Sequence, residues 1–300
     1  MRRQFQSLSP KGLDYRLPPM TLWRKAKKFG IWDPQSIDLS RDAEDWKGLD
    51  ALQQELILRL TCLFQAGEES VTLDLLPLIQ VIAGEGRLEE EMYLTSFLWE
   101  EAKHVEAFRR FLDEVVQDAS DLARFETPSY CTIFHQELPT ALARLRDDAS
   151  PVAQAEASVT YNMIVEGVLA ETGYHAYHQM LVDNDLMPGM QKVVAHLKND
   201  ESRHMAYGIF LLSRLVAEHG DPVWEAVERR MSTLLPIAIG VVNEIFETYD
   251  DELPFGLRQD VFVGYAMTQF QRRFARLEKA RNQTLDEVCR SALEAEATPA

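Results

Sequence analysis

The sequence has few cysteines and no excess of basic residues. Its three cysteines, at positions 62, 131 and 289, form no Cys-x-x-Cys pair, which argues against a disulfide framework and against a zinc site. The 48 acidic residues outnumber the 31 basic ones, and the formal net charge of −17 disfavours binding to nucleic acid or to an anionic membrane surface. We therefore expect a cytoplasmic protein with no nucleic-acid partner.

Long apolar runs are also missing. The uncharged stretch 231–243 is shorter than the roughly 20 residues that span a bilayer, so no integral membrane segment is expected. It contains Pro236, which, like Pro77 in another apolar pattern, should end or kink its helix. No apolar stretch follows the basic residues after Met1, so a secretory signal is not expected.

No part of the chain alternates apolar and polar residues in the manner of a strand, so the predicted fold class is all-α. Residues 1–48 are rich in proline and tryptophan, which predicts an extended N-terminal arm packed on the body. We expect a single domain over 1–300, with a helical core at 50–250 and C-terminal helices with a short tail at 251–300. Helical patterns cover residues 50–76, 86–117, 151–183, 189–218, 222–249 and 258–295.

Two Glu-x-x-His motifs stand in these helical surroundings, one at Glu101 and His104 and the other at Glu201 and His204. Three residues along a helix turn through roughly 300°, so each Glu and its His leave the helix from the same face. One such pair can hold one metal ion. The two motifs therefore predict a site for two metal ions between helices.

Both motifs interrupt stripes that are otherwise apolar. Stepping three or four residues along each helix gives core-type residues, except at Glu101 and His104 on one helix and at Glu201 and His204 on the other. An ionised Glu in a buried stripe is costly unless it is paired or bound to a metal. The opposite face of the first helix carries charged residues that we expect to face solvent: Glu100, Lys103, Glu106, Arg109 and Arg110.

Two further helices offer the remaining candidate ligands. Glu68 lies on an apolar stripe, whereas its neighbour Glu69 is rotated toward solvent. Glu166 is the inward-facing candidate on the third helix, and Glu171 is the weaker competitor. Asp200 is either a hydrogen-bond acceptor for a ligand histidine or an ordinary surface residue.

The candidate ligands are thus four glutamates and two histidines. Four carboxylates balance two divalent cations, which makes burial of the site tolerable, and oxygen-rich donors with one imidazole per metal suit iron or manganese. One Glu from each of two helices and a Glu-x-x-His from each of two others is the pattern of ferritin-like dinuclear carboxylate proteins. The set comprises Glu68, Glu101, His104, Glu166, Glu201 and His204.

The chain from about 55 to 250, with the order Asp200-Glu201-x-x-His204, resembles the ribonucleotide reductase small-subunit superfamily. The stretch 64–71 (Phe-Gln-Ala-Gly-Glu-Glu-Ser-Val) and Trp32-Asp33-Pro34 resemble its ligand-binding oxidase branch. The resemblance implies a ferritin-like helical bundle, a homodimer, and a cofactor of one manganese and one iron, with di-iron as the alternative.

Two features differ from the radical-generating subunits of this superfamily. Those subunits usually carry a tyrosine one helical turn after the first ligand histidine, where this chain has Phe108. They also end in a flexible tail with a tyrosine, whereas the last tyrosine here is Tyr265 and the tail at 292–300 has none. One small-subunit branch also has phenylalanine at the first position, so the missing tail tyrosine is the stronger evidence for the oxidase branch.

The resemblance further implies a self-generated ether link between the side chain of Tyr161 and the β-carbon of Val71. Val71 lies on the same helical stripe as Glu68, as such a link requires. Tyr161 precedes Glu166 by five residues, about 500° of helix, so an ideal helix turns it away from the site. Either that helix is locally widened, or Tyr161 is only a core aromatic residue.

Finally, the resemblance implies a long-chain fatty acid bound at the metals, with its tail in an apolar tunnel. Residues 234–242 are a candidate lining of that tunnel, with an ordinary core helix as the alternative reading. The expected function is that of a dioxygen-activating dinuclear metal oxidase that performs two-electron C–H oxidation. The alternatives are a ribonucleotide reductase radical subunit and a non-enzymatic metal-binding ferritin-like protein.

Overall fold

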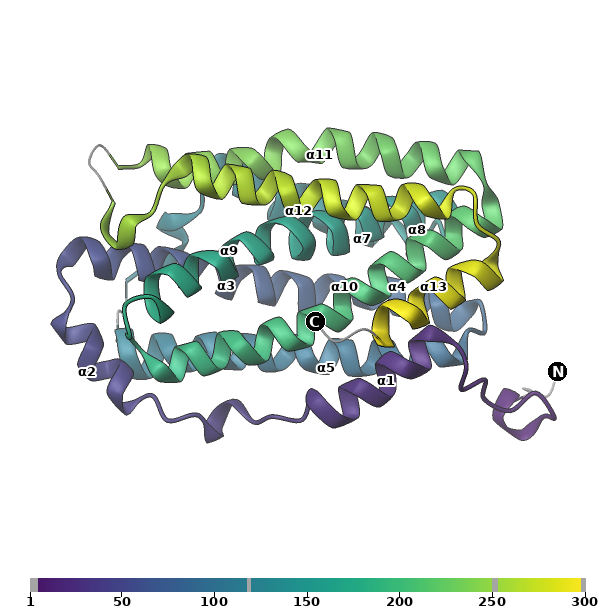
Figure 1. Ribbon diagram of the computed structural model, residues 1–300, viewed down its shortest axis with the longest axis horizontal. Helices are drawn as coiled ribbons and strands as arrows, with labels where there is room; N and C mark the ends of the chain where they lie inside the picture. Colours follow the sequence, from purple (N-terminus) through teal and green to yellow (C-terminus); the bar gives the residue numbers. More distant parts are fainter. Residues whose placement is uncertain (1–4, 118–119, 250–252, 298–300) are drawn as a thin grey trace.

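A computed structural model describes residues 5–117, 120–249 and 253–297 of the protein. Within these ranges all regular structure is helical, so the predicted all-α class is confirmed (Figure 1). The α-helices are α1 (Pro18–Phe29), α2 (Ser40–Gly48), α3 (Ala51–Asp74), α4 (Leu76–Gly84), α5 (Leu88–Phe111), α6 (Pro128–Cys131), α7 (Leu138–Arg144), α8 (Pro151–Ser158), α9 (Glu171–Tyr177), α10 (Pro188–His219), α11 (Asp221–Glu247), α12 (Gln259–Ala280) and α13 (Leu285–Ala297).

Four π-helical segments extend or join these helices. They are η3 (Leu112–Val116), η5 (Thr132–Glu137), η6 (Val159–Ala170) and η7 (His178–Val182). Because η6 and η7 follow α8 and α9 without a break, Pro151–Val182 is one long helical rod, close to the predicted helix at 151–183. Short 3₁₀ turns occur at Gln6–Leu8, Pro34–Ser36, Leu122–Phe125 and Pro254–Gly256.

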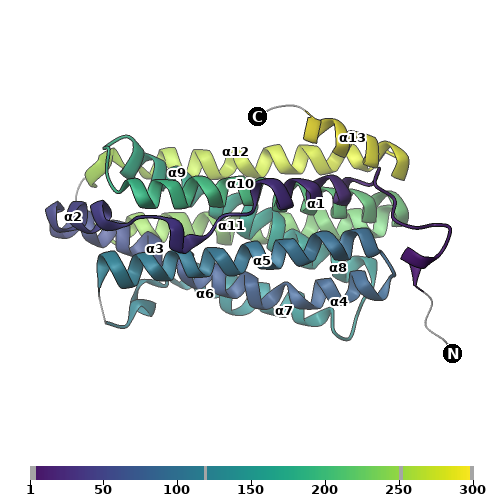
Figure 2. The same cartoon turned by 90° about the horizontal axis from the view of Figure 1, so that it is seen from below.

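The long helices lie side by side along the long axis of the molecule (Figures 1 and 2). α3 packs against α5, and η6 packs against α10, α11 and α12. Apolar side chains from all of these helices fill one continuous core. The four helical segments α3, α5, η6 and α10 carry the residues that the sequence singles out, so the bundle brings them toward a common interior.

The N-terminal arm packs on the body, but it is not extended throughout. It contains the helices α1 and α2, and α1 lies across α5 and α10 (Figure 2). The carboxylate of Asp42 on α2 accepts hydrogen bonds from the backbone N–H groups of Gly189 (2.8 Å) and Met190 (2.6 Å). These are two of the N–H groups that the first turn of α10 leaves without a helical partner, so the arm caps a core helix.

The predicted single helix at 258–295 is wrong, because the structure has two helices, α12 and α13, separated by a turn. Thr284 begins the second one: its Oγ1 accepts from the N–H of Glu287, whose carboxylate accepts from the N–H of Thr284 in return. This reciprocal cap gives a helix start that periodicity alone does not reveal. Pro77 stands in the first turn of α4, after the end of α3, whereas α11 continues through Pro236.

Two further sequence expectations concern membranes and disulfides. Among the residues that the structure describes, no helix combines the length and apolar character needed to cross a membrane. Among the described residues, none of Cys62, Cys131 and Cys289 is joined in a disulfide.

Candidate metal centre

All six candidate ligands converge at one place inside the bundle. Glu68 comes from α3, Glu166 from η6, and the two Glu-x-x-His motifs from α5 and α10. Their donor atoms fall into two overlapping groups, each within 4.8 Å: Glu68, Glu101, His104 and Glu201 form one, and Glu101, Glu166, Glu201 and His204 form the other.

Glu101 and Glu201 belong to both groups and bridge them. Nδ1 of His104 lies 3.5 Å from Glu101 Oε2 and 3.6 Å from Glu201 Oε1. Nδ1 of His204 lies 3.2 Å from Glu101 Oε1 and 3.4 Å from Glu201 Oε2. Each histidine also faces one terminal carboxylate, Glu68 at 3.4 Å or Glu166 at 3.6 Å. The arrangement supplies two adjacent donor sets that share two carboxylates.

The site fits a pair of cations because its buried donor atoms lack other partners. All six ligands are buried, with at most 5% of any residue exposed. Within the described part of the chain, five of their polar atoms have no hydrogen-bond partner, and all five belong to the cluster: Glu101 Oε2, His104 Nδ1, Glu166 Oε1, Glu201 Oε2 and His204 Nδ1. Buried polar groups are normally satisfied, so a group of five that converges on one space calls for bound metal.

The electrostatics of the cluster agree with this interpretation. Burial, aided by neighbouring carboxylates, raises the pKa of Glu68 to about 8 and the pKa of Glu166 well above its ordinary value. Burial opposes ionisation of Glu101 as well, but the imidazoles of His104 and His204 beside it outweigh burial and hold the pKa of that carboxyl below its usual range. The negative charges of four carboxylates packed this closely repel one another, and divalent cations would compensate that repulsion.

The outer nitrogen of each histidine meets a buried carboxylate. His104 Nε2 lies 3.3 Å from Asp200 Oδ2, and His204 Nε2 lies 2.9 Å from Glu100 Oε2. Such contacts fix the orientation of a ligand imidazole and raise its basicity. Arg203 joins the two halves, because its guanidinium donates both to Glu100 (2.6 Å) and to Asp200. Of the two readings of Asp200, the structure therefore supports the hydrogen-bond acceptor.

The expectation that Glu100 and Lys103 face solvent is wrong. Glu100 is fully buried, and Lys103 is 5% exposed, because α1 and the segment after it cover that face of α5. A Cβ on Gly30 would lie only 2.0 Å from Glu100 Oε1, which shows how closely the arm approaches. Lys103 donates to the carbonyl oxygen of Gly30 and to Asp200. The amphipathic pattern of one helix could not show that a distant arm seals its polar face.

Tyr161 is brought to the site by a widened helix. The segment η6, which carries both Tyr161 and Glu166, is π-helical over Val159–Ala170, so five residues complete little more than one turn. The Tyr161 hydroxyl is fully buried and donates toward the backbone oxygen of Val71 (3.2 Å) and toward Glu101 Oε1 (3.4 Å). The structure thus contains the local widening that the sequence left as one of two possibilities.

The weaker ligand candidates lie elsewhere. Glu69 is exposed, and Glu171 lies near Arg273 of α12, with its carboxylate 3.5 Å from the guanidinium. Asn162, which the sequence analysis missed, donates from its amide to Glu166 Oε2 (2.9 Å) and thereby orients that carboxylate. Phe108 is fully buried and packs against Phe64.

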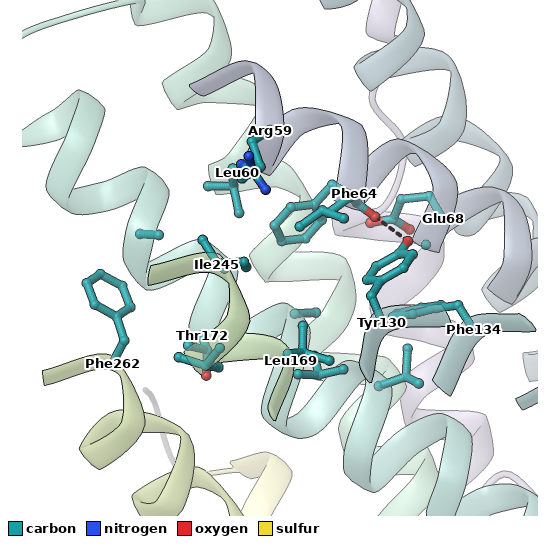
Figure 3. Close-up of a pocket in the computed structure, with 18 of the residues that line it drawn as sticks. Arg59, Leu60, Phe64, Glu68, Tyr130, Phe134, Leu169, Thr172, Ile245 and Phe262 are labelled. Atoms are coloured by element: carbon teal, nitrogen blue, oxygen red, sulfur yellow. Dashed lines mark hydrogen bonds between the residues drawn. The ribbon is translucent and has the colours of Figure 1, made fainter. Parts of the chain in front are cut away.

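An apolar pocket opens onto the same carboxylates (Figure 3). Glu68 lies toward one end of it, and Phe262 toward the other, with Leu169 and Ile245 between them. Of the predicted tunnel lining at 234–242, only Val241 and Val242 line the pocket. The expectation is therefore mostly wrong: the last turns of α11 line the pocket, whereas Leu234 and Ala238 are buried in the main core.

The comparison with protein families agrees with the geometry of the site. Residues 18–278 match the model of the family described as ribonucleotide reductase, small chain. The chain belongs to this family. The resemblance to this family that the sequence analysis describes is therefore confirmed.

Solved structures narrow the comparison. The chain is 37% identical to an R2-like ligand-binding oxidase from Sulfolobus acidocaldarius, with a TM-score of 0.87 over 96% of this chain and 99% of that one. It is 36% identical to an R2-like ligand-binding oxidase with an aerobically reconstituted Mn/Fe cofactor, with a TM-score of 0.88 over 92% of this chain and 98% of that one. These matches confirm the ferritin-like bundle and place the chain among the R2-like ligand-binding oxidases, a group of enzymes.

Proposed function

We propose that this protein is a dioxygen-activating oxidase with one manganese and one iron ion held by Glu68, Glu101, His104, Glu166, Glu201 and His204. The observation that carries the proposal is the convergence of five buried, unpartnered donor atoms on the space between α3, α5, η6 and α10. The similar Mn/Fe-containing oxidase supports the choice of metals. When bound, the metals would supply the redox chemistry, binding dioxygen and donating electrons to it.

The first C–H bond to be oxidised is, in our proposal, that of the Val71 β-carbon, with formation of an ether to the oxygen of Tyr161. The reaction removes the phenolic hydrogen of Tyr161 and one hydrogen of Val71, two protons and two electrons in all. Dioxygen would accept those two electrons and two protons and, with two more electrons from the metals and two more protons from solvent, be reduced to two water molecules. Support comes from the Tyr161 hydroxyl, which lies 3.2 Å from the backbone oxygen of Val71.

The surrounding side chains prepare Tyr161 for this step. Burial raises the pKa of the Tyr161 hydroxyl well above its ordinary value, so the phenol keeps its proton until an acceptor takes it. Glu101 Oε1, at 3.4 Å, is the carboxylate oxygen that faces the hydroxyl. Phe97 packs edge-on against the Tyr161 ring and, with the other buried aromatic residues, keeps water away from the reacting atoms.

Peptide mapping after metal loading in air tests the cross-link. We expect a Tyr161 peptide joined to a Val71 peptide, with a loss of two hydrogens, and no joined peptide in the Tyr161→Phe variant. Tyr174→Phe is a matched control, since Tyr174 is an equally buried tyrosine that is not hydrogen-bonded to Val71. Unlinked peptides from fully loaded wild-type protein would contradict the proposal.

We also propose a long-chain fatty acid as the occupant of the apolar pocket, with its carboxylate toward the metals. The pocket lining supports this choice, because the four glutamates lie together while most of the other lining residues are apolar. Solvent extraction and mass spectrometry of the purified protein should release a fatty acid. Ala176→Trp, which fills the pocket, should abolish the release, whereas Ala102→Trp on the exposed face of α5 should not. Fatty acid retained by Ala176→Trp would contradict the assignment.

A homodimer is the assembly that the family resemblance leads us to propose. The exposed leucines Leu73 and Leu76, where α3 meets α4, provide an apolar surface of the kind found at subunit contacts. Sedimentation equilibrium should give twice the chain mass. A monomer at micromolar concentration would rule out a stable homodimer.

A further inference from the structure

Outside the dinuclear site, three side chains with metal-binding donors converge on the outer face of residues 126–135. Glu126 precedes α6, Cys131 is its last residue, and His135 lies one turn later in η5. His135 Nε2 is 3.0 Å from Glu126 Oε2, and Cys131 Sγ is 3.8 Å from the same oxygen. One donor atom from each residue lies within 4.8 Å of the other two.

The backbone that carries these residues is held in place. Thr127 caps α6, with its Oγ1 accepting from the N–H of Tyr130, and the N–H of Cys131 donates to the carbonyl oxygen of Thr127 at 2.8 Å. Glu244 of α11 accepts from both the backbone N–H (2.9 Å) and the hydroxyl (2.5 Å) of Ser129. The three donors therefore project from an anchored turn.

Their spacing is that of ligands around one zinc ion. With tetrahedral angles and usual bond lengths, a zinc-bound sulfur and oxygen lie roughly 3.6 Å apart, and a zinc-bound nitrogen and oxygen roughly 3.4 Å apart. The observed sulfur–oxygen distance of 3.8 Å and nitrogen–oxygen distance of 3.0 Å are each close to the corresponding value.

We propose that Glu126, Cys131 and His135 form a second metal site, which binds a single Zn²⁺ with water as the fourth ligand. The donors are softer than those of the dinuclear centre, which has no sulfur ligand, so the two sites should prefer different metals. The His135 side chain is 55% exposed and that of Glu126 is 20% exposed, so the fourth position is open to solvent.

The site has a structural consequence for the ligand pocket. Tyr130 and Phe134, each next to a proposed zinc ligand in the chain, are buried and line the pocket (Figure 3). Their rings stack at 4.3 Å, and the Tyr130 hydroxyl donates to the carbonyl oxygen of Leu63 on α3. Zinc bound to the outer face would brace this wall of the pocket.

Cobalt substitution tests the site in the protein already loaded with manganese and iron. We expect one additional Co²⁺ per chain, with a near-ultraviolet thiolate-to-cobalt absorption band that Zn²⁺ abolishes. Cys131→Ser should lose the band, and His135→Asn should weaken Co²⁺ binding about tenfold or more. Cys289→Ser is the control, because Cys289 is also a partly buried free thiol but has no place in the cluster.

Hydrogen exchange provides the second readout. Zinc should slow the hydrogen exchange of backbone amides in 126–135 of the wild type, and it should not change their exchange rate in Cys131→Ser. Circular dichroism would establish that the variant is folded. The absence of the band, or its persistence in folded Cys131→Ser, would overturn the proposal. Because the band requires a thiolate, neither result depends on whether the dinuclear centre is an oxidase.

Discussion

His104 and His204 occupy corresponding positions in their motifs, yet their surroundings differ. Behind His104, Asp200 also accepts hydrogen bonds from the Trp32 indole (2.8 Å), from Lys103 (3.1 Å) and from Arg203. Behind His204, Glu100 has Arg203 as its other side-chain donor in the described part of the chain. The His204 ring instead stacks on Phe97, with centroids 3.6 Å apart.

The difference shows which part of the chain supports each half of the site. The His104 half depends on the N-terminal arm, since Trp32 reaches Asp200 and stacks on His196 of α10 with centroids 4.9 Å apart. In the His204 half the arm lies against Glu100 at Gly30, but the imidazole and its terminal carboxylate are held by the bundle, through Phe97 of α5 and Asn162 of η6. Variants that affect one half and spare the other therefore test this division of the site.

The largest effect should come from removing a carboxylate that both halves share. Glu101→Ala should lose both metals, with affinity reduced by more than about 100-fold, because even the loss of outer hydrogen-bond partners costs up to about that factor. Elemental analysis of the purified variant measures the retained metals. Glu106→Ala on the same helix is the control, since Glu106 lies outside both donor groups. Retention of two metals by Glu101→Ala would show that the carboxylate does not bridge.

Glu100→Ala should affect the two halves unequally. It removes the acceptor for His204 and leaves Asp200 as the carboxylate partner of Arg203 in the described part of the chain, so we expect one metal to bind about 10- to 100-fold more weakly than the other. Metal titration followed by electron paramagnetic resonance separates the two ions. Asp200→Ala is the matched variant and should weaken the opposite metal. Equal losses at both metals in each variant would contradict the division into halves.

The ligands and the residues around them differ in how far the sequence could predict them. The six ligands were predictable because Glu and His residues replace apolar ones in helical stripes, and that pattern is local. Glu100 was not predictable, because it lies on a helix face that looks solvated until the N-terminal arm covers it at Gly30, which lies about 70 residues earlier in the chain. The π-helix at η6 was only one of two possibilities, because no local pattern distinguishes it from an α-helix.

Gly208→Ala should have a smaller effect, confined to the His204 half. A Cβ at this position would lie 2.4 Å from Cβ of Asn162, which orients Glu166. We expect a loss of about 1–3 kcal/mol in the free energy of unfolding of the apoprotein and weaker binding of one metal. Urea denaturation measures the change in the free energy of unfolding. Gly264→Ala on α12 meets no atom within 4 Å and should instead stabilise by about 0.5–1 kcal/mol. Similar stability changes in both variants would refute the close packing of Gly208 on Asn162.

The smallest effect should come from Trp32→Phe, which keeps an aromatic ring beside His196 but removes the indole donor to Asp200. Asp200 retains Lys103 and Arg203, so we expect a loss of about 1 kcal/mol, roughly fivefold in affinity for the metal at His104. Competition with a chelator measures this change in metal affinity. A larger effect on the metal at His204 would show that the arm does not support the His104 half.

The central claim is that the twin motifs build one buried site for two different metal ions. Elemental analysis of protein loaded in air with manganese and iron together tests it most directly. We predict one manganese and one iron per chain in the wild type at these six ligands, and neither in Glu101→Ala. Wild-type protein that holds fewer than two of these metal ions per chain, two ions of the same metal, or many more than two would contradict the account.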